Sequence, residues 1–161
     1  MQHTNNHLPG PALIADFTLT KAGISHVQLL PNPKSSTFSW HFSGDKEASL
    51  EQNVAKWVHS YCQRQQPDIE LPVVLDYLPP YTKHVLMVLR HQPFGSVLSY
   101  QQLAAATGCP RGARAAGNAC GRNPCPLIVP CHRILASDGK IGGFSAGLAI
   151  KQILLEFEGL M

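Results

Sequence analysis

Hydrophobic and polar residues alternate near the start of the chain, a pattern that predicts β-strands. Residues 12–19 and 24–30 are short and rich in β-branched side chains, and residues 21–23 form a polar, glycine-containing break between them. We expect these two segments to form a hairpin, with residues 37–42 as a third strand. The polar residues 1–10 are expected to be a frayed end.

The pattern changes to a helical one over residues 47–61. Large apolar side chains recur there at steps of three and four, which gives a helix one buried face; they are Leu50, Val54, Trp57, Val58 and Tyr61. Prolines then interrupt the pattern as far as Pro80. We place a domain boundary near residue 78, with residues 1–78 as an N-terminal α/β structural domain and residues 79–161 as a C-terminal domain.

The C-terminal half is predicted to be mostly helical. We expect helices after Thr82, over residues 99–106 with Ser99 as N-cap, and over residues 111–121, with a tight turn at Gly108-Cys109-Pro110 between the last two. Such a helix-turn-helix is common in DNA-binding proteins and in others. The fold class is therefore α+β, a small sheet-plus-helix domain packed on a helical domain.

Two further segments follow the helix-turn-helix. Residues 127–129 are expected to be a short buried strand that ends at Pro130, and residues 136–143 a loop. Ser145 is expected to cap a final helix with an apolar stripe; its members are Ala146, Ile150, Ile153, Leu154 and Phe157.

Composition and charge narrow the class of protein. Of the 161 residues, 44% are hydrophobic and 14% charged, which is typical of a globular chain. Residues 1–78 carry five Lys and Arg against seven Asp and Glu, whereas residues 79–161 carry eight against three. The C-terminal half is therefore the better partner for a polyanion, unless the split is accidental. Five cysteines without a secretory leader or a membrane-spanning run indicate reduced thiols in an intracellular protein.

The candidate chemistry centres on Pro130-Cys131-His132-Arg133. Cations beside a cysteine favour its thiolate, so we expect His132 and Arg133 to lower the pKa of Cys131. Neighbours in extended backbone point to opposite sides, so His132 would reach the thiol through one water. Glu158 or Glu156 could orient the imidazole.

Two other interpretations of Cys131 stay open. A Cys-His pair is often only a buried structural thiol. Zinc would need Cys120, Cys125, Cys131 and His132, but their spacing lacks the close pairs of structural zinc sites, so we expect no metal.

The second helix of the helix-turn-helix is built from small residues. Gly112, Ala113, Ala115, Ala116, Gly117, Ala119 and Gly121 leave Arg114 as its long side chain. A major-groove reader would present several long polar side chains, whereas a smooth helix with one arginine suits a narrow groove and insertion into the base stack. Close packing against another helix would explain the small residues equally well.

Both features fit a nucleophile that acts on a base in DNA. Such a base must be flipped out of the duplex, and Arg114 could fill the space it leaves. Tyr100, at the start of the first helix, could hydrogen-bond to the departing base, although it could also be a core tyrosine.

From about residue 80 to residue 159 the chain resembles the O6-alkylguanine-DNA alkyltransferases (methylated-DNA–protein-cysteine methyltransferases). The resemblance rests on seven short segments: Phe94-Gly95, Ser99-Tyr100-Gln101-Gln102-Leu103-Ala104, Ala113-Arg114-Ala115-Ala116-Gly117, Asn123-Pro124, Ile128-Val129-Pro130-Cys131-His132-Arg133, Gly142-Gly143-Phe144-Ser145, and Lys151 with Leu154-Leu155 through Glu158-Gly159. The N-terminal half matches only in outline.

The resemblance implies an enzyme, a single-turnover transferase that moves an alkyl group from O6 of guanine, with O4-alkylthymine as a second candidate, to its own cysteine. Cys131 would be the acceptor, His132 the base, acting through water, and Glu158 its orienter. Tyr100 would assist guanine departure, and Asn123 would hold the active-site turn. The family uses no cofactor.

The resemblance also implies the binding residues. Arg114 would be the intercalating finger, and Ser99, Ala113, Ala115, Gly117 and Arg122 would contact DNA. Substrate contacts would come from Tyr100, Phe144, the Ser145 backbone N–H, and the carbonyls of Cys131 and Ile134. The expected partner is double-stranded DNA, bound through the minor groove without sequence specificity, by a monomer that binds no membrane and is cytoplasmic, or nuclear in a eukaryote.

The chain departs from the family pattern in several places. Phe144 stands where many members have tyrosine, which removes a hydroxyl and a partner for Lys151, and Cys120, Gly121 and Arg122 differ from the commoner pattern. His3, His7, His26 and Cys62 lack ligand spacing, so the zinc site of some members is not expected.

Two competing functions are a lesion-binding protein without transfer and a cysteine-based transcription regulator. The presence of Cys131 argues against the first. The smooth second helix argues against the sequence readout that the second needs.

Overall fold

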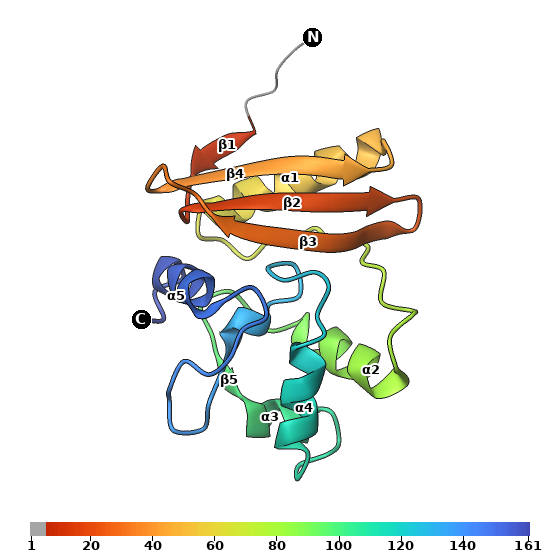
Figure 1. Ribbon diagram of the computed structural model, residues 1–161, viewed down its shortest axis with the longest axis vertical. Helices are drawn as coiled ribbons and strands as arrows, with labels where there is room; N and C mark the ends of the chain where they lie inside the picture. Colours follow the sequence, from red (N-terminus) through yellow and green to blue (C-terminus); the bar gives the residue numbers. More distant parts are fainter. Residues whose placement is uncertain (1–5) are drawn as a thin grey trace.

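The computed structural model describes residues 6–161, and a four-stranded sheet forms one side of the molecule (Figure 1). The strands are β1 (His7–Pro9), β2 (Leu13–Thr20), β3 (Gly23–Pro31) and β4 (Thr37–Gly44), in the order β1-β4-β2-β3. The hairpin β2–β3 and the third strand β4 are confirmed, and β4 runs parallel to β2.

The expectation of a frayed end over residues 1–10 is wrong for its second half. Strand β1 pairs antiparallel with β4, which satisfies the backbone groups of an edge that would otherwise be open. Residues 1–5 lie outside the described part of the chain.

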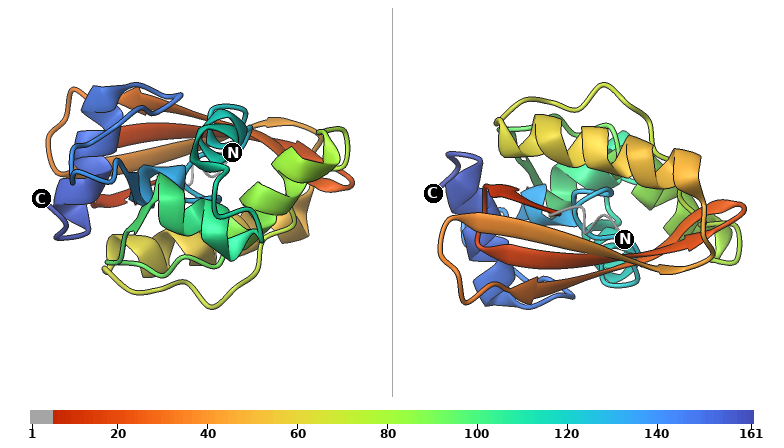
Figure 2. Two further views of the ribbon diagram at one scale, coloured as in Figure 1. Left: turned by 90° about the horizontal axis from the view of Figure 1, so that it is seen from below. Right: turned by 90° about the horizontal axis from the view of Figure 1, so that it is seen from above.

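The helix α1 (Ala48–Cys62) lies along one face of the sheet, as the view from above in Figure 2 shows. Strand β2 buries every second side chain, including Leu13 and Phe17. Helix α1 buries four of the five residues of its predicted apolar stripe, and Leu50 is half-buried. Apolar side chains recur at every second position in the strands and at every third or fourth position in the helix, because each element turns one face toward the layer that it packs against.

The second half of the chain packs beside the sheet, along the edge formed by β3 (Figure 1). Its elements are α2 (Pro80–Leu89), β5 (Leu98–Ser99), α3 (Tyr100–Ala106), α4 (Ala113–Cys120), the short 3₁₀ helix η1 (Cys131–Arg133), β6 (Ile134–Leu135) and α5 (Leu148–Phe157). The predicted N-cap Ser99 is confirmed: its hydroxyl accepts from the Gln102 backbone N–H, and the Gln102 side chain accepts from the Ser99 N–H.

Three sequence expectations in this half are wrong: two helices begin at other residues, and one strand does not form. Helix α2 begins at Pro80 rather than after Thr82, because proline is well accommodated in the first helical turn. Helix α5 begins at Leu148, after Gly147, rather than at Ser145. Residues 127–129 form no strand: the backbone turns at Leu127, whose φ is 78°, and only an isolated bridge joins Pro126 to Val129.

The two halves share one continuous core. The Ile24 N–H donates to the Pro72 carbonyl at 2.9 Å, and the Val27 N–H donates to the Pro124 carbonyl at 2.9 Å. Strand β3 thus touches both the connection between the halves and the segment that leads to Cys131. The division near residue 78 stays a prediction.

Within residues 6–161, no helix combines the length and apolarity needed to cross a membrane.

The contact between β3 and the connecting segment predicts a sensitive glycine. A Cβ at Gly23 would lie 2.6 Å from the Pro72 carbonyl oxygen, whereas one at Gly108 would meet nothing within 4 Å, although both residues have positive φ. Gly23→Ala should therefore lower the free energy of unfolding by about 2 kcal/mol more than Gly108→Ala, since only it adds a collision to the backbone strain. Urea unfolding of both variants measures this, and equal losses would contradict it.

Candidate active site

Cys131 begins the 3₁₀ helix η1 and lines a cavity of about 250 Å³. The residue is buried, with 4% of its surface exposed. The walls come from α3, α4 and the loop before α5; they consist of Tyr100, Gly117, Cys120, Gly121, Cys131, Gly143, Phe144 and Ser145. Small residues on α4 leave the space open.

The Cys131 thiol is protonated in the resting protein. Burial raises its pKa to about 11, against the opposing effects of a hydrogen bond from Asn123 and of the Lys151 charge. The expectation that His132 and Arg133 would favour the thiolate is wrong. Arg133 is neutralised by Glu158, and burial outweighs the remaining cations.

Asn123 ties the end of α4 to the turn that carries the thiol. Its Nδ2 donates to the Val129 carbonyl at 2.8 Å and to Cys131 Sγ at 3.1 Å, and its Oδ1 accepts from the Cys125 N–H at 3.0 Å. This buried amide therefore fixes the position of the sulfur and offers it a donor.

His132 is fully buried and makes one side-chain contact that sets its tautomer. Its Nε2 lies in a short hydrogen bond with Glu158 Oε2, while Nδ1 finds no partner among residues 6–161. Burial lowers the pKa of the imidazole, against the stabilising effect of Glu158, so the ring is neutral and Nδ1 is free to accept a proton.

The backbone around His132 differs from the expected one. Cys131 and His132 lie in a 3₁₀ turn rather than in extended chain, so the argument from opposite-facing neighbours does not apply. The structure also chooses between the two candidate carboxylates, because Glu156 is exposed and accepts from Gln152 instead.

Glu158 accepts hydrogen bonds from four donors in three parts of the chain. Besides His132, the donors are Arg133 Nε at 2.7 Å, the Tyr61 hydroxyl at 2.9 Å and the Gly95 N–H at 3.2 Å. Burial alone would raise the pKa of this carboxyl, but the hydrogen bonds and charges of His132 and Arg133 lower it to about 2. The carboxylate is therefore ionised at neutral pH.

Lys151 is a fully buried ammonium on α5. Its Nζ donates to the Ile134 carbonyl at 2.6 Å and the Gly143 carbonyl at 2.9 Å, and no carboxylate of residues 6–161 pairs with it. These two hydrogen bonds join β6 to the loop at Gly143. The neighbouring Phe144 has no hydroxyl that could accept from this lysine. The Ile134 carbonyl, expected to face the substrate, accepts one hydrogen bond from this lysine.

Tyr100 forms the wall opposite the loop. A Cβ at Gly142 would lie 3.3 Å from its ring and one at Gly117 would lie 3.5 Å away, so both glycines leave room for the aromatic ring. Burial raises the pKa of Tyr100, so its hydroxyl is protonated at neutral pH. This hydroxyl donates to the Gly143 carbonyl at 3.4 Å, a long hydrogen bond that it could exchange for one to a bound base.

The remaining predicted site residues lie on the outer surface around the cavity. Arg114, Ala115 and Arg122 are exposed, while Ala113 and Ser99 are half-buried. The structure thus gathers Tyr100, Gly117, Cys131, Phe144 and Ser145 at one cavity, and Asn123, His132 and Glu158 behind it. Ile134 is fully buried and is not one of the residues that line the cavity.

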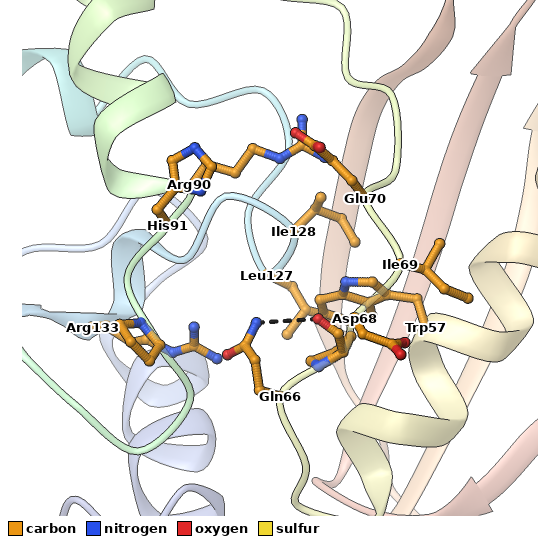
Figure 3. A pocket seen from close by; sticks show the side chains of 12 residues that line it. Trp57, Gln66, Asp68, Ile69, Glu70, Arg90, His91, Leu127, Ile128 and Arg133 are labelled. Atoms are coloured by element: carbon orange, nitrogen blue, oxygen red, sulfur yellow. Dashed lines mark hydrogen bonds between the residues drawn. The ribbon is translucent and has the colours of Figure 1, made fainter.

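A second hollow of about 280 Å³ lies between the two halves of the molecule (Figure 3). Trp57 and Gln66 line it from the first half, and Arg90, Ile128 and Arg133 from the second. Cys131 does not line it. Within the described part of the chain, no three His, Cys, Asp or Glu side chains gather as metal ligands.

Sequence reasoning missed two functional contacts. Tyr61 was assigned to the apolar stripe of α1, and its hydroxyl reaches Glu158 across 97 positions of sequence. The second contact is that of Lys151 with two backbone carbonyls, which sequence does not predict because lysine is rarely buried.

Comparisons with known proteins agree with this geometry. Residues 80–160 match the family described as 6-O-methylguanine DNA methyltransferase, DNA binding domain. The chain is 42% identical over 109 residues to a human protein named methylated-DNA–protein-cysteine methyltransferase, covering 64% of this chain and 53% of that protein. A protein of the same name from Methanosarcina barkeri is 32% identical over 149 residues, 92% of this chain and 90% of the relative.

A solved structure extends the similarity to the fold. The crystal structure of Mycobacterium tuberculosis OGT in complex with DNA superposes with a TM-score of 0.68 at 25% identity, covering 90% of this chain and 92% of that one. The aligned chain spans 53% of the human relative and 66% of the one from Cricetulus griseus.

The four-donor cage predicts how stability depends on pH. The pKa of Glu158 falls from 4.5 to about 2 on folding, so its contribution of about 3 kcal/mol is complete above pH 4.5 and is lost as the pH falls toward 2. Glu158→Gln should cost about 3 kcal/mol in urea unfolding at pH 6, and this difference from the unsubstituted protein should shrink by about 2 kcal/mol at pH 3. The exposed neighbour provides the control: Glu156→Gln should be neutral at both pH values, and a Glu158→Gln difference independent of pH would contradict the assignment.

Proposed function

Because the chain belongs to the 6-O-methylguanine DNA methyltransferase family, we propose that it repairs DNA by moving an alkyl group from O6 of guanine to its own Cys131. The observation that carries the proposal is a protonated thiol that lines a base-sized cavity, next to a neutral histidine held by an anionic glutamate. A nucleophile of this kind needs a base at the moment of attack.

The base is His132, acting through one water. As the thiol pKa is about 11, almost no thiolate exists at neutral pH. The proton of Cys131 passes by the water to the free Nδ1 of His132, while Nε2–H stays bonded to Glu158. Glu158 stabilises the imidazolium that forms, and Asn123 and Lys151 stabilise the negative sulfur.

The transfer itself is a displacement at the alkyl carbon. The sulfur forms a bond to this carbon as the carbon–O6 bond breaks. The electron pair of the carbon–O6 bond leaves with the guanine. Tyr100 hydrogen-bonds to the departing base and supports the charge that it gains. The Ser145 backbone and the Phe144 ring complete the wall that holds the base.

The reaction is stoichiometric and needs no cofactor. The thioether is stable, so each molecule reacts once. O4-alkylthymine is a second candidate substrate, because the glycines at positions 117, 121 and 143 leave the cavity wide.

Duplex DNA binds on the face of α4 that carries small residues. Ala113, Ala115 and Gly117 allow the backbone of the minor groove to approach, and the exposed Arg114 enters the space left by a flipped base. Few long polar side chains reach base edges from this helix, so binding is independent of sequence. Ser99 and Arg122 contact the flanking phosphates, and the excess of Lys and Arg in residues 79–161 adds to the attraction.

The protein works as a monomer in the compartment that holds the DNA, the cytoplasm of a prokaryote or the nucleus of a eukaryote. Its helices and sheet bury one common core without a second chain.

Alkyl transfer to Cys131 can be tested by mass spectrometry. Incubation with a duplex containing O6-methylguanine should add one methyl group to the peptide with Cys131, at one equivalent per protein, as measured by mass spectrometry. Cys131→Ala should abolish transfer and keep DNA binding, whereas Cys120→Ala, which changes the other thiol of the cavity, should still be methylated. Repeated turnover, or methyl on another residue, would contradict the proposal, and binding without transfer would identify a lesion-binding protein.

Base flipping can be tested by comparing repair of duplex DNA with reaction of a free base. Arg114→Ala should slow repair of duplex DNA by about tenfold or more, since unstacking a base costs a few kcal/mol, and leave reaction with free O6-benzylguanine unchanged. Lys34→Ala removes an equally exposed charge from the N-terminal half and should slow neither reaction. Equal slowing of both reactions by Arg114→Ala would remove the flipping role.

A further inference from the structure

The N-terminal half places one polar atom against the catalytic acid–base pair. The hydroxyl of Tyr61, in the last turn of α1, donates to Glu158 Oε2 at 2.9 Å. The same oxygen holds Nε2 of His132. Two donors from different halves of the chain therefore share one carboxylate oxygen.

The Tyr61 ring is fixed independently of this hydrogen bond. It stacks on Trp57 with centroids 5.4 Å apart and planes 8° apart, and it meets Phe94 and Phe157 at 5.5 Å each. The side chain is fully buried. Its hydroxyl therefore cannot move to another partner without breaking an aromatic cluster that spans both halves.

The apolar role of Tyr61 would be met equally well by phenylalanine. A buried hydroxyl is costly unless it is paired, and here its partner is the carboxylate that orients the base. Burial and Glu158 raise the pKa of Tyr61 well above its ordinary value, so the hydroxyl keeps its proton and acts only as a donor.

We propose that Tyr61 is a positioning residue for alkyl transfer, which draws negative charge from Glu158 and so keeps His132 a neutral base with a free Nδ1. This inference rests on the function proposed above and adds the N-terminal half to the acid–base chain. A donor on Oε2 takes up part of the charge that would otherwise stabilise the imidazolium. Without that donor, Glu158 would hold a proton on His132 more strongly.

Other charged groups around His132 do not replace this effect. The ring is faced by Arg133 from η1, Lys151 from α5, Glu158 after α5 and the neighbouring Cys131. Arg133 and Lys151 oppose protonation of the ring, and Glu158 favours it. Tyr61, from α1, is the neutral donor that acts on Glu158 itself.

Tyr61→Phe tests the proposal because it removes the hydroxyl and keeps the ring. The pKa of His132, followed by NMR titration of its imidazole, should rise by about half a unit. The acid limb of the rate of Cys131 alkylation by O6-benzylguanine should move to higher pH by the same amount, because more of the base is protonated at a given pH. The rate on the plateau at higher pH should stay within about twofold of the unsubstituted protein.

Trp57→Phe is the matched control. It disturbs the same aromatic cluster without touching Glu158, so it should lower the unfolding midpoint and leave the His132 titration in place. A Tyr61→Phe protein whose His132 titration is unchanged overturns the proposal, even if its rate falls. If the unsubstituted protein transfers no alkyl group, the proposed function fails, while the titration still decides what Tyr61 does to His132.

Discussion

A single buried carboxylate organises the site. Glu158 is 7% exposed and receives donors from α1, from the turn at Gly95 and from both residues that follow Cys131. A buried anion is tolerated only when such donors replace its water shell. The four donors that bind this carboxylate come from distant segments of the chain, which therefore meet at one point. The contact with Glu158 engages Nε2 of His132 and leaves Nδ1 free. The cavity, the thiol and the turn that carries them are arranged around this ion.

Local pattern predicted most of the fold. Strands β2 to β4 and helix α1 follow from periodicity, and Ser99 marked the start of α3 because a capping box is encoded within four residues. The failures have local physical causes. Strand β1 has only three residues and forms by pairing with β4, so its own sequence carries little signal. Residues 127–129 were expected to be a strand, but they lie between Pro126 and Pro130 and the backbone turns at Leu127, which has a positive φ.

The candidate site was predictable in its residues but not in its electrostatics. The motif around Cys131 pointed to the nucleophile, the base and Glu158, and the resemblance to a known family supplied Tyr100, Asn123 and Arg114. Sequence could not show that burial would raise the thiol pKa to about 11, since the cations beside Cys131 suggested the reverse. Nor could it show Tyr61 reaching Glu158 or Lys151 binding two carbonyls, because these contacts depend on how distant elements pack.

The central claim is that His132 is a neutral base, protonated at Nε2 toward Glu158 and free at Nδ1. Nitrogen-15 NMR of the histidine ring at pH 7 tests it most directly, because the two ring nitrogens have different shifts in each protonation state. We expect a protonated Nε2 and an unprotonated Nδ1 for this residue. A doubly protonated ring, or a proton on Nδ1 alone, would contradict the account.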